Sequence, residues 1–147
     1  MGGIERSAHV VWRGGLDRGS GTVSARSGAV EELPVTWTSR VERPDGRTSP
    51  EELIAGAHAA CYAMAFSNVL NEAGNPPDQL DVEAVVSAEL GDEGLRVTSS
   101  VLDVTGRVPG MDAAEFERLA QEGERSCPVS NALRGNVDIR VNARLEE

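Results

Sequence analysis

The middle of the chain carries a long apolar segment bounded by helix-end signals. Ser49-Pro50-Glu51-Glu52 has the form of a capping box, with serine at the N-cap, proline at the first helical position and glutamate at the third. Gly74 and the two prolines that follow it end the pattern. We therefore expect a buried central helix with Cys61 near its middle. Apolar residues recur at helical spacing within it, at Leu53, Ile54, Ala57, Cys61, Met64, Ala65 and Val69.

The segments on either side of this helix have the character of strands. Turn signals such as Gly14-Gly15 separate the early strands, and the later strands alternate apolar and polar residues. A second helix follows the cap signal at Asp112, and a short third helix starts near Pro128. The whole chain, residues 1–147, is predicted to form one α+β domain. Strands are expected at 9–12, 21–24, 35–38, 81–85, 95–104 and 136–143.

Charge excludes some classes of partner. The chain has 14 basic and 24 acidic residues, with a formal charge of −10. Nucleic acids and anionic membranes bind clustered positive charge, so neither is expected as a partner. The first seven residues lack an apolar leader segment, and no apolar run approaches the ~20 residues of a membrane span. We expect a cytoplasmic protein, whose cysteines are more often catalytic, redox-active or metal-binding than structural.

Only two cysteines occur, Cys61 and Cys127, 66 positions apart. This separation does not match paired zinc-ligand motifs. His58 precedes Cys61 by three positions on the same helix face, so a zinc or iron site with His58 and both cysteines is one alternative. A Cys–His hydrolase is another, although the rigid spacing along one helix disfavours it. Each cysteine could also be a small buried residue without chemistry.

Two features favour redox chemistry. Cys127 lies at the start of a short helix, where backbone N–H groups stabilise a thiolate. Glu51 stands at the start of the Cys61 helix and, about 15 Å of helix rise away, cannot touch that thiol itself. Glu51 could instead hold an arginine that activates the thiol. The candidates for that arginine are Arg40, Arg43 and Arg47 just upstream and Arg18 in an earlier loop.

These residues resemble the osmotically inducible protein C (OsmC) family. The stretch from Thr48 to Cys61, which contains Ala57-His58-Ala59-Ala60-Cys61, is similar to the central-helix signature of that family. Cys127-Pro128-Val129 is similar to its second-cysteine motif. The related organic hydroperoxide resistance (Ohr) proteins usually carry an aromatic residue where this chain has His58, so the resemblance favours the OsmC branch.

The resemblance implies a fold, an activity and roles for four residues. The fold would be antiparallel sheets wrapping a long central helix, in an intertwined homodimer. Cys61 would attack the peroxide O–O bond and become a sulfenic acid, and Cys127 would condense with it to a disulfide. Arg40 would polarise thiolate and peroxide and Glu51 would hold Arg40, with Arg18 as the alternative arginine. No metal or bound cofactor is implied, and an external dithiol, such as a lipoylated protein, would regenerate the enzyme.

The predicted function is thus a thiol-dependent peroxidase that reduces organic hydroperoxides, and hydrogen peroxide as a second substrate, in oxidative or osmotic stress defence. The apolar residues around Cys61, including Met64 and Phe66, suit an organic hydroperoxide, although core packing explains them equally well. The alternative is a non-enzymatic redox sensor or apolar-ligand-binding protein of the same fold. Turnover with a dithiol distinguishes the two hypotheses.

Overall fold

The computed structural model describes residues 2–146. Contacts divide the chain into two compact units, residues 1–53 and residues 54–147. Strands and helices are both present, as the α+β prediction requires. That residues 1–147 form a single domain stays a prediction.

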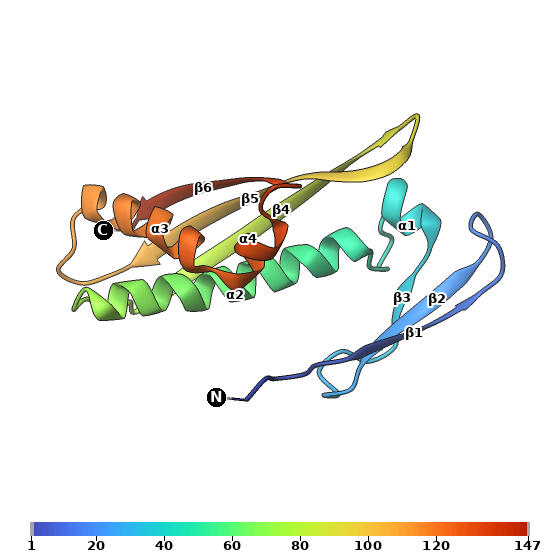
Figure 1. The fold of residues 1–147 in the computed structure, drawn as a ribbon, viewed down its shortest axis with the longest axis horizontal. Helices are drawn as coiled ribbons and strands as arrows, with labels where there is room; N and C mark the ends of the chain where they lie inside the picture. Colours follow the sequence, from blue (N-terminus) through green and yellow to red (C-terminus); the bar gives the residue numbers. More distant parts are fainter. Residues whose placement is uncertain (1, 147) are drawn as a thin grey trace. The chain divides into compact units, whose positions relative to one another are not determined.

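The first unit contains a three-stranded antiparallel sheet with the order β1-β2-β3 (Figure 1). The strands are β1 (Ala8–Arg13), β2 (Ser20–Ala25) and β3 (Leu33–Val35). The strand expected at 35–38 is wrong beyond its first residue, because Thr36 is the N-cap of a short helix, α1 (Trp37–Val41). The Thr36 side chain accepts the Ser39 N–H, and this local capping overrides the strand preference of the β-branched and aromatic residues.

Helix α2 (Pro50–Glu72) begins where the capping signal predicts and continues into the second unit. The Ser49 hydroxyl accepts the Glu52 N–H at 3.1 Å, but the Glu52 carboxylate bonds the Thr48 hydroxyl rather than closing the capping box. By length and composition α2 could cross a membrane, contrary to the expectation that no segment qualifies. The core helix of a soluble protein passes the same test.

The second unit is built on the sheet β4-β5-β6, with β4 (Gln79–Gly91), β5 (Gly94–Arg107) and β6 (Asp138–Leu145). β4 and β5 form an antiparallel hairpin. β6 pairs with β5 in parallel, which differs from the all-antiparallel expectation. The reason is the connection between them, which crosses over through α3 (Ala113–Ser126) and α4 (Pro128–Leu133) instead of a tight turn.

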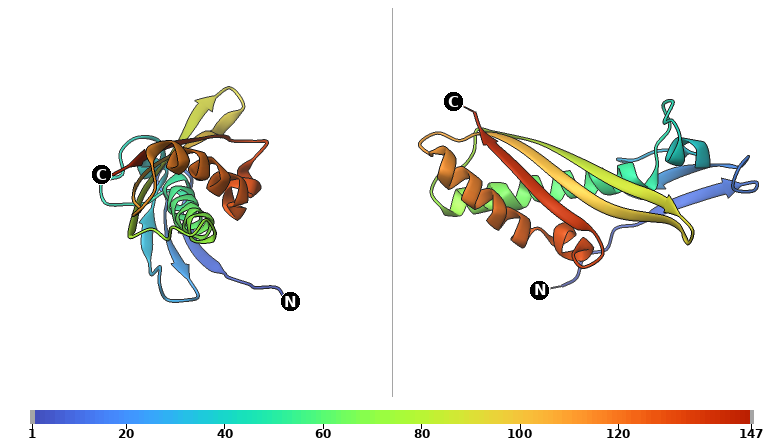
Figure 2. Two further views of the ribbon diagram at one scale, coloured as in Figure 1. Left: turned by 90° about the vertical axis from the view of Figure 1, so that its left-hand side faces the viewer. Right: turned by 90° about the horizontal axis from the view of Figure 1, so that it is seen from above.

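The core of the second unit lies between this sheet and the two long helices α2 and α3, which Figure 2 shows on the same side of it. The fully buried stripe of α2 consists of His58, Tyr62, Phe66 and Leu70. The stripe expected through Cys61 and Met64 is wrong in part, since Met64 is 70% exposed and Cys61 is half-buried. α2 is apolar on several faces, so its hydrophobic pattern could not indicate which face the chain covers.

Close backbone approach sets the position of α3 on α2. A Cβ atom at Gly123 would lie 3.0 Å from the Cβ of Phe66, so any larger residue would require Phe66 to shift by a few tenths of an ångström. One helical turn away, the Tyr62 hydroxyl donates to the Ala120 carbonyl at 2.9 Å. These contacts hold the C-terminal end of α3, and therefore Cys127 immediately after it, against α2.

Candidate active site

In the first unit, Arg40 and Glu51 form a two-point ion pair. Arg40 Nε donates to Glu51 Oε1 at 3.0 Å and Arg40 Nη2 donates to Oε2 at 2.9 Å. The Arg40 side chain is 31% exposed and that of Glu51 12%. A guanidinium held at two points by a carboxylate has a fixed direction. Among residues 2–146, no atom accepts a hydrogen bond from Arg40 Nη1, which leaves a donor for a further ligand.

The local sequence explains why these two side chains meet. Arg40 lies in the last turn of α1 and Glu51 in the first turn of α2. The segment between them is tied back, because Thr48 N–H donates to the Pro34 carbonyl at 2.8 Å. The Ser39 hydroxyl donates to the Thr48 carbonyl at 2.9 Å. These two bonds bring the end of α1 beside the start of α2.

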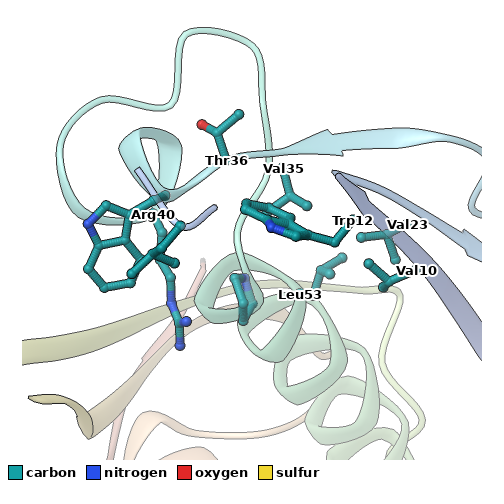
Figure 3. Close-up of a pocket in the computed structure, with 10 residues that line it drawn as sticks. Val10, Trp12, Val23, Val35, Thr36, Arg40 and Leu53 are labelled. Carbon is teal, nitrogen blue, oxygen red and sulfur yellow. The ribbon is translucent and has the colours of Figure 1, made fainter. Parts of the chain in front are cut away.

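Arg40 borders an apolar groove of about 420 Å³ in the first unit (Figure 3). Trp12 and Val35 from the sheet and Leu53 from α2 form much of its wall. The Trp37 ring also lines it, and its centroid lies 6.0 Å from Arg40 Cζ. A groove with apolar walls and one cation suits a ligand that has an apolar body and a polar or developing negative end.

In the second unit, Cys61 and Cys127 are both free thiols. Cys61 is half-buried in the middle of α2, whereas Cys127 is fully buried at the junction of α3 and α4. Cys127 is the N-cap of α4, and its Sγ accepts the Ser130 N–H at 3.5 Å. Cys61 packs against the buried core cluster to which Cys127 belongs, and the nearby Cys127 thiol raises the pKa of Cys61.

The surroundings of Cys61 act on its pKa in both directions. Burial raises the pKa most, and the nearby Cys127 raises it further. The backbone N–H of Val129, in the first turn of α4, lowers it. The second unit therefore supplies one group that stabilises a Cys61 thiolate, while its net effect disfavours ionisation. An activated Cys61 needs a further cation, as the reasoning from sequence also required.

His58 lies fully buried one turn before Cys61 and joins two serines. Its Nδ1 is 2.6 Å from the Ser100 hydroxyl on β5, and its Nε2 is 2.7 Å from the Ser130 hydroxyl on α4. Burial lowers the pKa of His58 and Glu124 raises it to a smaller extent. The imidazole is therefore neutral at neutral pH, with one nitrogen as donor and the other as acceptor.

A second ion pair lies beside Cys127. Arg134, which follows α4, donates to the carboxylate of Glu124 near the end of α3 and to Asn131 Oδ1 at 2.9 Å. The Glu124 hydrogen bond raises the pKa of Arg134, and proximity to Cys127 adds to this.

Among the residues predicted from sequence, the structure brings together Arg40 with Glu51, and Cys61 with Cys127. Arg18, the alternative arginine, is exposed in the turn between β1 and β2 and forms no ion pair within residues 2–146. Sequence reasoning missed Ser100, Ser130 and the Val129 N–H. The available signals were a serine in the apolar run of β5 and a serine three residues after the helix-capping Cys127.

The zinc or iron alternative would require His58 and both cysteines to converge on one ion. Within the described part of the chain, no three side chains of His, Cys, Asp or Glu are grouped so that they could hold a metal ion. Both His58 nitrogens are already engaged by serine hydroxyls, so His58 is not directed at either sulfur.

Known proteins resemble this chain over most of its length. The family model described as OsmC-like protein matches residues 43–142. Peroxiredoxin OsmC of Escherichia coli is 40% identical over 136 residues, 92% of this chain and 94% of the relative. Organic hydroperoxide resistance protein OhrA of Bacillus subtilis is 31% identical over 123 residues, 78% of this chain and 82% of the relative. The crystal structure of OhrB of the same organism has a TM-score of 0.70 at 25% identity, covering 95% of this chain and 98% of that one. The chain therefore belongs to the family of OsmC-like proteins.

Proposed function

We propose that this protein is a cysteine-based peroxidase that reduces organic hydroperoxides to alcohols. The observation that carries the proposal is the pair of neighbouring free thiols, one half-buried on α2 and one buried at the N-cap of α4. The names of its relatives, peroxiredoxin OsmC and organic hydroperoxide resistance protein, describe the same chemistry. Two thiols held side by side can pass through a sulfenic acid to a disulfide without a metal or bound cofactor.

The proposed reaction has two steps on the protein. The Cys61 thiolate attacks one oxygen of the hydroperoxide, the O–O bond breaks, and the alcohol leaves with a proton while the sulfur becomes a sulfenic acid. Cys127 then attacks the Cys61 sulfur, the S–O bond breaks, and water leaves with the thiol proton as the disulfide forms. An external dithiol, such as a lipoylated protein, restores both thiols by exchange and is itself oxidised to a disulfide.

In this scheme we assign to Arg40 the activation of the Cys61 thiolate and the stabilisation of the negative charge that develops on the leaving oxygen. Glu51 holds Arg40 at two points, and Nη1 remains for the substrate. The apolar groove beside Arg40 would receive the organic part of the hydroperoxide. This arrangement favours an organic hydroperoxide over hydrogen peroxide, which has no apolar body to bury.

We further propose a cytoplasmic homodimer. Large apolar side chains stay uncovered in both units, among them Leu16 at 57% and Met64 at 70% exposure. Exposed apolar surface of this kind is typical of a subunit interface. Sedimentation of the full chain at micromolar concentration should give twice the monomer mass, and a monomer at that concentration would contradict the proposal.

Mass spectrometry after one equivalent of cumene hydroperoxide tests the peroxidase assignment. The expected product is an intramolecular Cys61–Cys127 disulfide, with a sulfenic acid trapped on Cys61 in the variant Cys127→Ser. Sulfenic acid on Cys127 in Cys61→Ser, with retained activity, would reverse the roles. Dihydrolipoamide should then support continuous peroxide consumption. Oxidation by a single equivalent without recycling would identify a redox sensor instead.

A further inference from the structure

His58 is a buried polar residue that the proposed reaction does not use. Its side chain is fully buried, as are Ser100 and Ser130, and each ring nitrogen has one hydroxyl partner. Within residues 2–146, no buried side-chain nitrogen or oxygen lacks a hydrogen-bond partner. Burying a polar group costs folding free energy unless the group is fully hydrogen-bonded, and an apolar side chain would fill the same space without that requirement. A role for His58 is therefore to be sought in the bridge itself.

The three residues of this bridge come from three elements that otherwise meet through apolar packing. His58 belongs to α2, Ser100 to β5 and Ser130 to α4. α4 has only six residues, so its own packing area is small. The His58–Ser130 bond at 2.7 Å is therefore a directional attachment of α4 to the helix that carries Cys61.

Ser130 lies in the turn whose backbone N–H groups interact with both cysteines, so a small displacement of Ser130 would change the surroundings of both sulfurs. Its backbone N–H donates to Cys127 Sγ at 3.5 Å. The preceding N–H, that of Val129, acts on Cys61. The same short turn thus bonds Cys127 and packs against the core cluster that Cys61 also contacts, and the hydroxyl of Ser130 is the atom through which α2 holds the turn.

We propose that His58 is a positioning residue, which acts through Ser130 to hold the first turn of α4 so that Cys127 faces Cys61. The bridge would raise the effective concentration of one thiol toward the other and so favour disulfide formation. Removing the His58–Ser130 bond would free the turn and weaken the pairing of the two sulfurs. The inference rests on the proposed function only in giving the cysteine pair a redox role.

The two serines supply a matched pair of variants. Ser100→Ala and Ser130→Ala each remove one oxygen that bonds the same imidazole, on opposite ring nitrogens, and only Ser130 belongs to the turn with Cys127. Each variant is equilibrated with reduced and oxidised dithiothreitol, so that protein dithiol and cyclic disulfide exchange against the reagent. Quenching, alkylation and mass spectrometry then give the fraction of Cys61–Cys127 disulfide. This equilibrium involves no peroxide and is independent of peroxidase activity.

Ser130→Ala should lower the equilibrium constant for disulfide formation about five- to tenfold, the worth of one buried hydrogen bond. Ser100→Ala should change it less than about twofold while losing similar thermal stability. His58→Leu should match Ser130→Ala, and the serine pair decides the question if that variant does not fold. Equal shifts in both serine variants, or none in Ser130→Ala, would overturn the proposal by reducing the bridge to a purely structural role.

Overoxidation gives a second measurement. A sulfenic acid that is not resolved reacts with another hydroperoxide to give sulfinic acid and alcohol. At fixed excess of cumene hydroperoxide, Ser130→Ala should raise the sulfinic fraction on Cys61 several-fold over Ser100→Ala, and equal fractions would contradict the inference. If the wild type forms no sulfenic acid, the peroxidase assignment fails, and the dithiothreitol equilibrium still decides the role of His58.

Discussion

The chain contains two polar clusters that differ in both charge and burial. Arg40–Glu51 is charged and partly exposed, with Arg40 31% accessible. Ser100–His58–Ser130 is neutral and fully buried. A charged group that stays in contact with water loses little solvation free energy, whereas burying an ion costs several kcal/mol. The comparison teaches that the arginine is suited to act on an incoming ligand, whereas the neutral bridge is suited to hold elements in place.

Replacing Arg40 should have the largest effect. If the ion pair serves chemistry, Arg40→Ala slows peroxide reduction about 10²- to 10³-fold, as expected for removal of one charged donor from a reacting centre. The unfolding free energy should change by less than about 1 kcal/mol, because the pair is partly exposed. Stopped-flow peroxide consumption and thermal unfolding measure the two quantities.

Arg40→Lys is the control for charge alone. Lysine keeps the positive charge but cannot make the two-point contact with Glu51, so most of the loss should persist. An unchanged rate in both variants would move the activating role to Arg18.

Replacing His58 should show the opposite pattern, with a large loss of stability and a smaller loss of the first chemical step. His58→Leu leaves two buried serine hydroxyls without their partner, which should cost about 2–3 kcal/mol of unfolding free energy. Chemical denaturation measures this cost, and the rate of sulfenic acid formation in a Cys127→Ser background measures the first step. A first step slowed as much as in Arg40→Ala would erase the distinction between the two clusters.

Much of the fold and part of the candidate site could be predicted from sequence, and the predictions that were wrong or missing have physical causes. The α2 start at Ser49 and the α4 start at Cys127-Pro128 follow from local signals, because caps and proline act within a few residues. The buried stripe of α2 could not be predicted, because a helix that is apolar on several faces does not indicate in its sequence which face is covered. Ser100 is 42 residues from His58 and Ser130 is 72, and no local pattern reports contacts at such separation.

Glu51→Gln tests how the charged cluster is built. Glutamine keeps one acceptor for Arg40 but loses the negative charge and the two-point geometry, so Arg40 is less firmly directed. We expect about a tenfold loss of peroxide reduction, smaller than for Arg40→Ala because the cation itself remains. In the double variant Arg40→Ala with Glu51→Gln, the rate should match that of Arg40→Ala alone. A further tenfold loss there would mean that Glu51 acts independently of Arg40.

The smallest effect concerns the protonation of the neutral cluster. Burial lowers the pKa of His58 in the folded protein below its ordinary value of 6.5. Below that value the unfolded chain binds a proton that the folded chain excludes, so stability present at pH 7 is lost as the pH falls. The loss attributable to His58 is at most about 1.3 kcal/mol between pH 7 and pH 5.5. Carboxylates also titrate as the pH falls, so the difference between the wild type and His58→Gln isolates this contribution. If the unfolding free energies of the two proteins fall in parallel as the pH falls, the folded protein tolerates a protonated His58. Burial would then not keep the Ser100–His58–Ser130 bridge neutral, and the contrast with the charged Arg40–Glu51 pair would be lost.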